Sequence, residues 1–294
     1  MVDLVVASVL GLAAFLTQAN SPAKPPAPSQ PVCAPPNPSL PGAKTEIYAE
    51  RSGRPLRIHI FTPASEAKDR PAALFFFGGG WSNGNAGQFQ DQAKALRDLG
   101  FVAAVADYRV FCRDRTTPTD AVDDAQAAYR WIRSHAATLG IDPRRIVIGG
   151  GSAGGHLAAM TAIRESTASR PAALILFNPV VDLTLSAIRK SVRLDDATAR
   201  SLSPALLPAT SLPPTIIFHG TEDKIVPIES VRHWCDAIRA KDGNCRFEEY
   251  SGFGHGFFNR RASEPTLATS AFADTLAKAA IFLRNAGLTP NTSR

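Results

Sequence analysis

Short apolar runs alternate along this chain with longer amphipathic stretches. The apolar runs have the length and the β-branched or aromatic content of buried strands; they lie at 56–61, 72–77, 101–106, 145–149, 173–177, 215–219 and 246–250. The stretches between them place apolar residues at helical spacing; they lie at 88–99, 119–138, 154–166, 228–240 and 267–285. This alternation predicts an α/β fold with a mostly parallel central sheet and helices on both faces. A break in it between Pro179 and Pro214 predicts a short cap rather than a second domain.

The first 42 residues do not follow this pattern. Residues 4–16 are almost entirely apolar, too few to span a bilayer comfortably, and small polar residues follow, as in a secretory signal peptide. The lack of Lys and Arg before this run, and Asp3, leave a buried strand or helix as the alternative. Residues 22–41 are rich in proline, which indicates an extended linker. We expect a signal peptide at 1–20, a linker at 21–42 and one folded domain at 43–288. The protein is then secreted or periplasmic, without a stable membrane span.

Charge and cysteine content narrow the class of protein. Basic residues exceed acidic ones by 6, but they are scattered rather than gathered into a stripe, which argues against a nucleic-acid partner. The cysteines are even in number, as in proteins of oxidising compartments; they are Cys33, Cys112, Cys235 and Cys245. Cys235 and Cys245 flank a short loop between a helix and a strand, and we expect them to form a disulfide. Whether Cys33 and Cys112 are paired stays open. These spacings do not fit a zinc site, so no metal is expected.

One pentapeptide carries the first candidate for chemistry. Gly150-Gly151-Ser152-Ala153-Gly154 follows an apolar strand and precedes an apolar helix. In a G-x-S-x-G elbow the strand turns at once into the helix, and glycines remove side chains that would clash, so the serine hydroxyl is presented above the sheet. Ser152 is therefore the candidate nucleophile, provided that a base, an acid and an oxyanion hole occur elsewhere.

A serine hydroxyl needs a base, and the base needs a group that orients it. Among the histidines, only His255 lies in a glycine-flanked loop late in the chain, so it is the candidate base. His156, one helical turn after the serine, is more simply a packing residue. The loop after the penultimate strand lies where active sites of α/β sheets collect, and it supplies Asp223 as the candidate acid in preference to Glu222. Asp182, which also follows a strand, is the alternative.

A run of glycines supplies donors that would stabilise an oxyanion. Gly78, Gly79 and Gly80 follow an apolar strand and precede Trp81. Backbone N–H groups without obstructing side chains suit a developing negative charge, so Gly79, Gly80 and Ala153 are the candidate donors. Trp81 is a candidate substrate-lining residue, although it fits core packing equally well.

Together these motifs resemble those of an α/β-hydrolase close to the carboxylesterases similar to hormone-sensitive lipase and to the related carbohydrate and feruloyl esterases. The resemblance covers about 43–287 and includes Asp107-Tyr108-Arg109 and 141–145 in the order that the family shows. It implies that the serine, aspartate and histidine above form a catalytic triad, that the N–H groups above form the oxyanion hole, and that no cofactor is needed.

The chain departs from the family pattern in three places. Phe77 precedes the glycines where the family usually has histidine, so a polar contact that steadies the loop is absent or replaced. The Tyr108-Arg109 motif runs into Val110-Phe111 instead of a proline-containing turn. The N-terminal helical cap of many relatives gives way to the proline-rich stretch, which implies an open site.

The resemblance implies a secreted serine hydrolase that cleaves carboxylic esters through an acyl-enzyme. The short cap and exported location favour short acyl groups, on a small molecule or on a polysaccharide such as acetylated or feruloylated xylan. Two alternatives are a serine peptidase of the prolyl-oligopeptidase type, which usually carries a large extra domain, and a binding protein on a hydrolase scaffold, which usually loses the serine or the base. Besides Trp81, the aromatic candidates for a substrate pocket are Phe111, Phe253 and Phe257. The sequence leaves the oligomeric state open.

Overall fold

The structure, a computed structural model, describes residues 32–37, 39–65, 67–208, 212–260 and 271–289. The expected signal peptide at 1–20 lies outside these residues, as does the first part of the expected linker. The compact unit begins at Cys33 rather than at 43. The chain departs from the expected linker there because Leu40 is buried and the residues before it are hydrogen-bonded to the domain.

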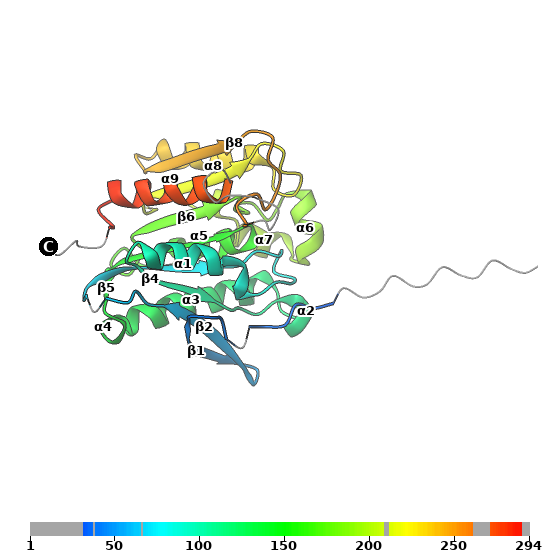
Figure 1. Ribbon diagram of the computed structural model, residues 1–294. Coiled ribbons are helices and arrows are strands. Elements are labelled where there is room, and N and C mark those ends of the chain that lie inside the picture. The colour runs from blue at the N-terminus through cyan, green and yellow to red at the C-terminus, as the bar shows by residue number, and fades with distance from the viewer. Residues whose placement is uncertain (1–31, 38, 66, 209–211, 261–270, 290–294) are drawn as a thin grey trace, which may run out of the picture. The chain divides into compact units, whose positions relative to one another are not determined.

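One eight-stranded sheet forms the centre of the domain, with its strands in the order β1-β2-β4-β3-β5-β6-β7-β8 (Figure 1). The pairs β1–β2 and β2–β4 are antiparallel and the others are parallel. The strands are β1 (Lys44–Arg51), β2 (Arg54–Phe61), β3 (Arg70–Phe76), β4 (Val102–Ala106), β5 (Ile141–Gly151), β6 (Ala173–Phe177), β7 (Thr215–Gly220) and β8 (Cys245–Tyr250). The predicted mostly parallel sheet is confirmed, and the carboxyl ends of its parallel strands meet at one edge, where α/β folds place their sites.

Helices cover both faces of the sheet, as predicted. In Figure 1, α1 (Gln90–Asp98) and α9 (Ala271–Asn285) lie in front of it, and α3 (Pro118–Ser134), α5 (Ala153–Arg164) and α8 (Ile228–Arg239) lie on the other face. The shorter helices are α2 (Phe111–Asp114), α4 (Ala136–Leu139), α6 (Ser186–Val192), α7 (Asp196–Ser201) and the 3-10 turns η1 (Ala86–Phe89) and η2 (Pro204–Leu206). Both α6 and α7, with η2, come from the predicted break in the alternation, between β6 and β7.

The apolar runs are the centre of the core. Every residue of β3, β4 and β6 is buried, because parallel strands with helices on both faces have no solvent side. The sequence pattern missed β1, in which only Tyr48 is buried. An edge strand exposed to solvent needs no continuous apolar run, so nothing in its composition distinguishes it from a loop.

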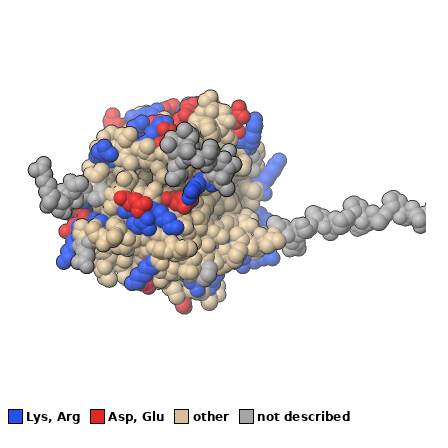
Figure 2. Space-filling view, in the orientation of Figure 1, with Lys and Arg blue, Asp and Glu red and all other residues tan. Residues whose placement is uncertain are grey.

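Two disulfides close loops of very different length. Cys235 in α8 and Cys245 in β8 are bridged, with Cα atoms 5.6 Å apart, which confirms the predicted pair. Cys33 and Cys112, left open by the sequence, are bridged as well. No helix in the described ranges is long and apolar enough to cross a bilayer. On the face seen in Figure 2, basic and acidic side chains are interspersed.

Candidate active site

The turn from β5 into α5 holds Ser152 at the carboxyl edge of the sheet. Its φ is +54° and its ψ −118°, a conformation that residues with side chains rarely adopt. A Cβ at Gly150 would lie 2.5 Å from the carbonyl oxygen of Phe76, and one at Gly154 would overlap the same oxygen. The two glycines therefore let β3 approach the turn closely enough to fix the serine there.

The loops after β7 and β8 bring Asp223 and His255 together. Oδ2 of Asp223 lies 2.8 Å from Nδ1 of His255. The other carboxylate oxygen, Oδ1, accepts hydrogen bonds from the backbone N–H groups of Ile225 and Val226 at 2.8 and 3.0 Å. The Asp223 side chain is fully buried, whereas that of His255 is partly exposed. This geometry holds Nδ1–H of the histidine on the carboxylate and leaves Nε2 as the nitrogen free to accept a proton.

A second histidine touches the same carboxylate. Nε2 of the buried His219, at the end of β7, lies 3.3 Å from Oδ2 of Asp223 and 3.1 Å from the carbonyl oxygen of Val226. Burial alone raises the pKa of Asp223, but hydrogen bonds from His219 and His255, with the backbone N–H of Val226, outweigh it and hold the pKa well below its usual range. The carboxylate is therefore ionised throughout the range in which histidines titrate.

The glycines after β3 form a tight turn beside the serine. Gly79 and Gly80 have φ values of +119° and +60°, which favour glycine. The carbonyl of Gly79 accepts hydrogen bonds from the N–H groups of Ser82 and Asn83 at 3.0 and 3.1 Å. A Cβ on Gly78 would lie 3.4 Å from Cβ of Ser152. The turn thus lies directly against the candidate nucleophile, as an oxyanion hole requires.

One cavity of about 410 Å³ lies between the candidate nucleophile, the candidate base and the glycine turn. Ser152, His255 and the glycines of the turn line it, together with a mainly apolar set of neighbours: Trp81, Val180, Ile188, Ile225 and Phe258. Ile188 comes from α6, which places the short cap at the cavity. Of the aromatic candidates, Trp81 lines this cavity, while Phe257 is buried in the core and Phe253 packs against its ring at 5.8 Å.

Comparison with known proteins decides the family. The sequence model of the family BD-FAE matches residues 58–190. Among solved structures, the propionate-bound esterase 2 of the Planctomycetes species Thermogutta terrifontis is 38% identical with a TM-score of 0.76, over 85% of this chain and 96% of that one. The chain belongs to the α/β-hydrolase serine esterases related to hormone-sensitive lipase.

Curated proteins similar to this chain carry ester-hydrolase names. The probable carboxylic ester hydrolase LipM of Mycobacterium tuberculosis is 30% identical over 188 residues, which are 55% of this chain and 43% of that protein. The isoprenylcysteine alpha-carbonyl methylesterase ICME of Arabidopsis thaliana is 25% identical over 229 residues, 68% of this chain and 53% of that protein. The chain spans about half the length of the curated relatives it matches.

The structure shows what replaces the usual histidine before the glycines. The ring of Phe77 stacks on Tyr108 with centroids 4.0 Å apart, and the Tyr108 hydroxyl donates to the carbonyl of Phe77 at 2.8 Å. Gln88 in η1 accepts a 2.6 Å hydrogen bond from the N–H of Gly78. Polar contacts to the loop therefore come from Tyr108 and Gln88. The role of Gln88 could not be predicted from the sequence, because nothing in a single glutamine ten positions downstream marks it as a partner of the glycines.

Asn178 is a further site residue that the sequence analysis missed. It follows β6 with φ +34° and is fully buried. Its amide nitrogen lies 3.1 Å from Nδ1 and 3.4 Å from Nε2 of His255. A buried amide in contact with both ring nitrogens limits how far the ring can rotate. The sequence does offer one indication of this role, because Asn178 is a polar residue directly after the buried strand β6.

The side chains of the remaining candidates, Asp182 and His156, have partners other than the triad. Oδ1 of Asp182 accepts from the N–H and hydroxyl of Thr184 at 2.8 and 2.6 Å, so this alternative acid is engaged in its own loop. His156 is buried, with Nε2 2.7 Å from the carbonyl of Leu202, and burial lowers its pKa to about 4. It meets Trp81 edge to face at 5.0 Å, which is the packing role expected. Within the described ranges no His, Cys, Asp and Glu side chains are grouped as a metal site.

Proposed function

We propose that this protein hydrolyses carboxylic esters through an acyl-enzyme, with Ser152, His255 and Asp223 as its catalytic triad. The observation that carries the proposal is the 2.8 Å Asp223–His255 contact beside a cavity that the strained Ser152 also lines. Fold, family and named esterase relatives support the reaction class.

The proposed reaction has two stages. Nε2 of His255 takes the proton of Ser152 as Oγ attacks the ester carbonyl, and the imidazolium is stabilised by Asp223. The N–H groups of Gly79, Gly80 and Ala153 donate to the oxyanion of the tetrahedral intermediate. The alcohol leaves with the proton from His255. A water molecule, deprotonated by the same histidine, then attacks the acyl-enzyme carbonyl, and the imidazolium returns the proton to Oγ of Ser152 as the acid leaves.

We propose short acyl groups as substrates, on a small alcohol or on a polysaccharide. The apolar walls of the cavity suit an alkyl chain, and its volume of about 410 Å³ suits a small one. The Thermogutta terrifontis enzyme has been solved with propionate and with butyrate, which supports the same class here. We also propose export through residues 1–20 to a secreted or periplasmic location; the two disulfides support it, since such bonds persist in oxidising compartments.

Ser152→Ala tests the reaction. It should lower kcat/KM for aryl acetate and butyrate by roughly 10⁴-fold or more and abolish labelling by a fluorophosphonate. Ser191→Ala is the matched control, because Ser191 lines the same cavity without a proposed role. This variant should keep both the hydrolysis and the fluorophosphonate labelling. Unchanged hydrolysis by Ser152→Ala would contradict the proposal. Faster turnover of a peptide amide than of any ester would favour the peptidase instead.

A substrate panel tests the ester class. Aryl esters from acetate to palmitate, with acetylated xylan and a feruloyl sugar beside them, should give the highest kcat/KM at two to four acyl carbons because the cavity, at about 410 Å³, is small. A maximum at long chains would contradict the short-chain assignment while leaving the triad intact.

A further inference from the structure

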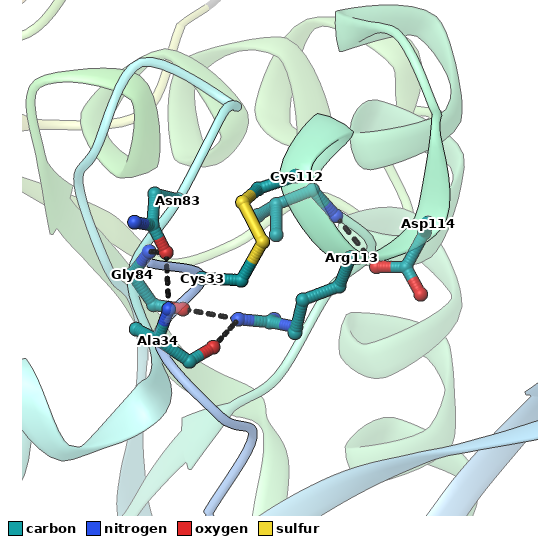
Figure 3. Close-up of a disulfide and its surroundings, with 8 residues drawn as sticks. Cys33, Ala34, Asn83, Gly84, Cys112, Arg113 and Asp114 are labelled. Atoms are coloured by element: carbon teal, nitrogen blue, oxygen red, sulfur yellow. Dashed lines mark hydrogen bonds between the residues drawn. A yellow bond between two sulfur atoms is a disulfide. The ribbon is translucent and has the colours of Figure 1, made fainter. Parts of the chain in front are cut away.

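A segment before β1 is fastened to the turn that carries the proposed oxyanion donors. We call residues 33–37 the strap and residues 79–84 the oxyanion turn. Figure 3 shows the strap, the turn and α2 meeting around the disulfide between Cys33 and Cys112. The two cysteines are 79 positions apart, with Cα atoms 5.7 Å apart. The bridge therefore joins the strap to a helix that follows β4.

The strap and α2 hold the far end of the oxyanion turn. Oδ1 of Asn83 accepts from the N–H groups of Ala34 and Gly84, both at 2.8 Å. One nitrogen of Arg113, Nη1, donates to the carbonyls of Ala34 at 2.8 Å and of Gly84 at 2.6 Å. A single guanidinium thus ties strap and turn together (Figure 3).

The first turn of α2 holds the middle of the oxyanion turn. The N–H of Phe111 donates to the carbonyl of Trp81, and that of Cys112 to the carbonyl of Ser82, both at 2.9 Å. Cys112 therefore binds the turn through its backbone and the strap through its side chain. The disulfide closes a ring of contacts around the turn.

These held positions determine where the candidate donors lie. The space that a Cβ on Gly79 would need is filled by the carbonyl oxygen of Asn83, and a Cβ on Gly84 would lie 2.7 Å from the carbonyl oxygen of Gly78. Residues 83 and 84 are thus in van der Waals contact with residues 78 and 79. A shift at the strapped end displaces the N–H of Gly79 as well, and displacements of about 1 Å in such groups cost on the order of 10²-fold in rate.

We propose that the Cys33–Cys112 disulfide and Arg113 position the oxyanion turn for catalysis. The proposal rests on the proposed ester hydrolysis and on Gly79 and Gly80 as oxyanion donors. Neither the disulfide nor Arg113 touches the substrate; both act through the turn. Their loss should lower kcat and leave KM nearly unchanged, because the oxyanion hole binds the transition state more strongly than the substrate.

The two disulfides of the chain provide a matched experiment. The double variant Cys33→Ser, Cys112→Ser and the control Cys235→Ser, Cys245→Ser each lose one bridge. With an aryl acetate, below the unfolding temperature of each protein, the first should lose at least about 10-fold in kcat with KM within about 3-fold. The control should keep kcat within about 2-fold. Equal kcat in the two double variants would overturn the proposal.

Arg113 variants test the same role with both disulfides intact. Arg113→Ala should lower kcat by about 10-fold, and Arg113→Lys should recover part of the loss, because an ammonium can still donate to one of the two carbonyls. Should the first double variant fail to fold, these two variants decide the question: a wild-type kcat for Arg113→Ala overturns the proposal.

Hydrogen exchange separates this proposal from the proposed function. Backbone amides of residues 78–84 should exchange faster in the strap variants than in the control, whether or not the protein hydrolyses esters. A wild-type protein that is inert to esters and to a fluorophosphonate would contradict the proposed function. If the strap variants exchange the amides of residues 78–84 no faster than the control does, the proposed role of the strap is contradicted.

Discussion

The two halves of the site are built by different means. The half from β3 and β5 places the nucleophile and the oxyanion turn against each other mainly through backbone contacts: Gly79, Gly150 and Gly154 stand where a Cβ would collide with a neighbouring carbonyl. The half from β7 and β8 places Asp223 and His255 through side-chain hydrogen bonds, with His219 and Asn178 as neighbours.

The backbone half of the site therefore depends on shape, whereas the side-chain half depends on charge. The backbone half cannot accept a Cβ at Gly79, Gly150 or Gly154 without moving, but its N–H donors do not titrate. The side-chain half should accept a replacement of the same shape, but it depends on the ionisation of Asp223 and on the tautomer of His255. Variants can therefore distinguish the two halves by what they disturb.

The largest expected effect is in the side-chain half. Asp223→Asn keeps the shape of the side chain but removes the negative charge and favours the wrong tautomer of His255. It should lower kcat/KM for an aryl acetate at pH 7 by on the order of 10³–10⁴-fold. Asp182→Asn, which alters the alternative acid, is the control and should stay within about 3-fold. A variant at position 223 that keeps a tenth of the activity would make Asp223 dispensable.

A somewhat smaller effect is expected in the backbone half. Gly79→Ala places a methyl group on the carbonyl of Asn83 at φ +119°, so the turn must move and the oxyanion loses a donor. Steady-state kinetics should show a loss in kcat of about 10²–10³-fold. Gly252 also has a positive φ, +77°, but open space surrounds it. The control variant Gly252→Ala should therefore cost little activity. Equal losses in both variants would mean that backbone strain rather than donor placement matters.

Gln88 tests whether a side chain supports the backbone half. Gln88→Ala removes the acceptor of the Gly78 N–H, so the glycine loop is held less firmly. The kcat of this variant should fall by about 10-fold. Gln88→Glu retains an acceptor oxygen and should recover most of that loss. If kinetics at pH 8 show no difference between wild type and Gln88→Ala, the stacking of Phe77 on Tyr108 is sufficient to hold the loop.

The smallest effect on activity is expected from the buried His156, whose influence is on stability. Its folded pKa of about 4 lies below the unfolded value of 6.5, so the unfolded chain binds more protons between these values. Acidification from pH 6.5 to 4 should therefore remove on the order of 3 kcal/mol of folding free energy. Urea unfolding of His156→Gln, which cannot be protonated, should show a shallower fall with pH. Parallel curves would contradict a neutral, buried His156.

The sequence predicted those features that repeat or that use distinctive residue types. Alternating apolar runs predicted the parallel strands, and the glycine-flanked Ser152 and His255 marked positions that the structure brings to one cavity. Features that depend on tertiary contact were not visible. Gln88 and Asn178 are ordinary polar residues until the fold places them against Gly78 and His255.

The strand β1 and the start of the folded unit were both missed in the sequence, and for the same reason. The edge strand β1 has no apolar run because one side of it meets solvent. The start of the folded unit at Cys33 was missed because proline-rich composition describes how a segment behaves alone, not what a disulfide and side-chain acceptors elsewhere can hold in place. In both cases the deciding partner lies far along the chain.

The bridge between Cys33 and Cys112 also bears on when and where the oxyanion turn gains its covalent support. Translation delivers Cys112 79 residues after Cys33, and the bond forms only where an oxidant accepts the two electrons that the two thiols release. A newly made chain held in a reducing environment lacks this covalent support for its oxyanion turn. On the two proposals made above, such a chain should hydrolyse esters with a lower kcat until the two thiols are oxidised.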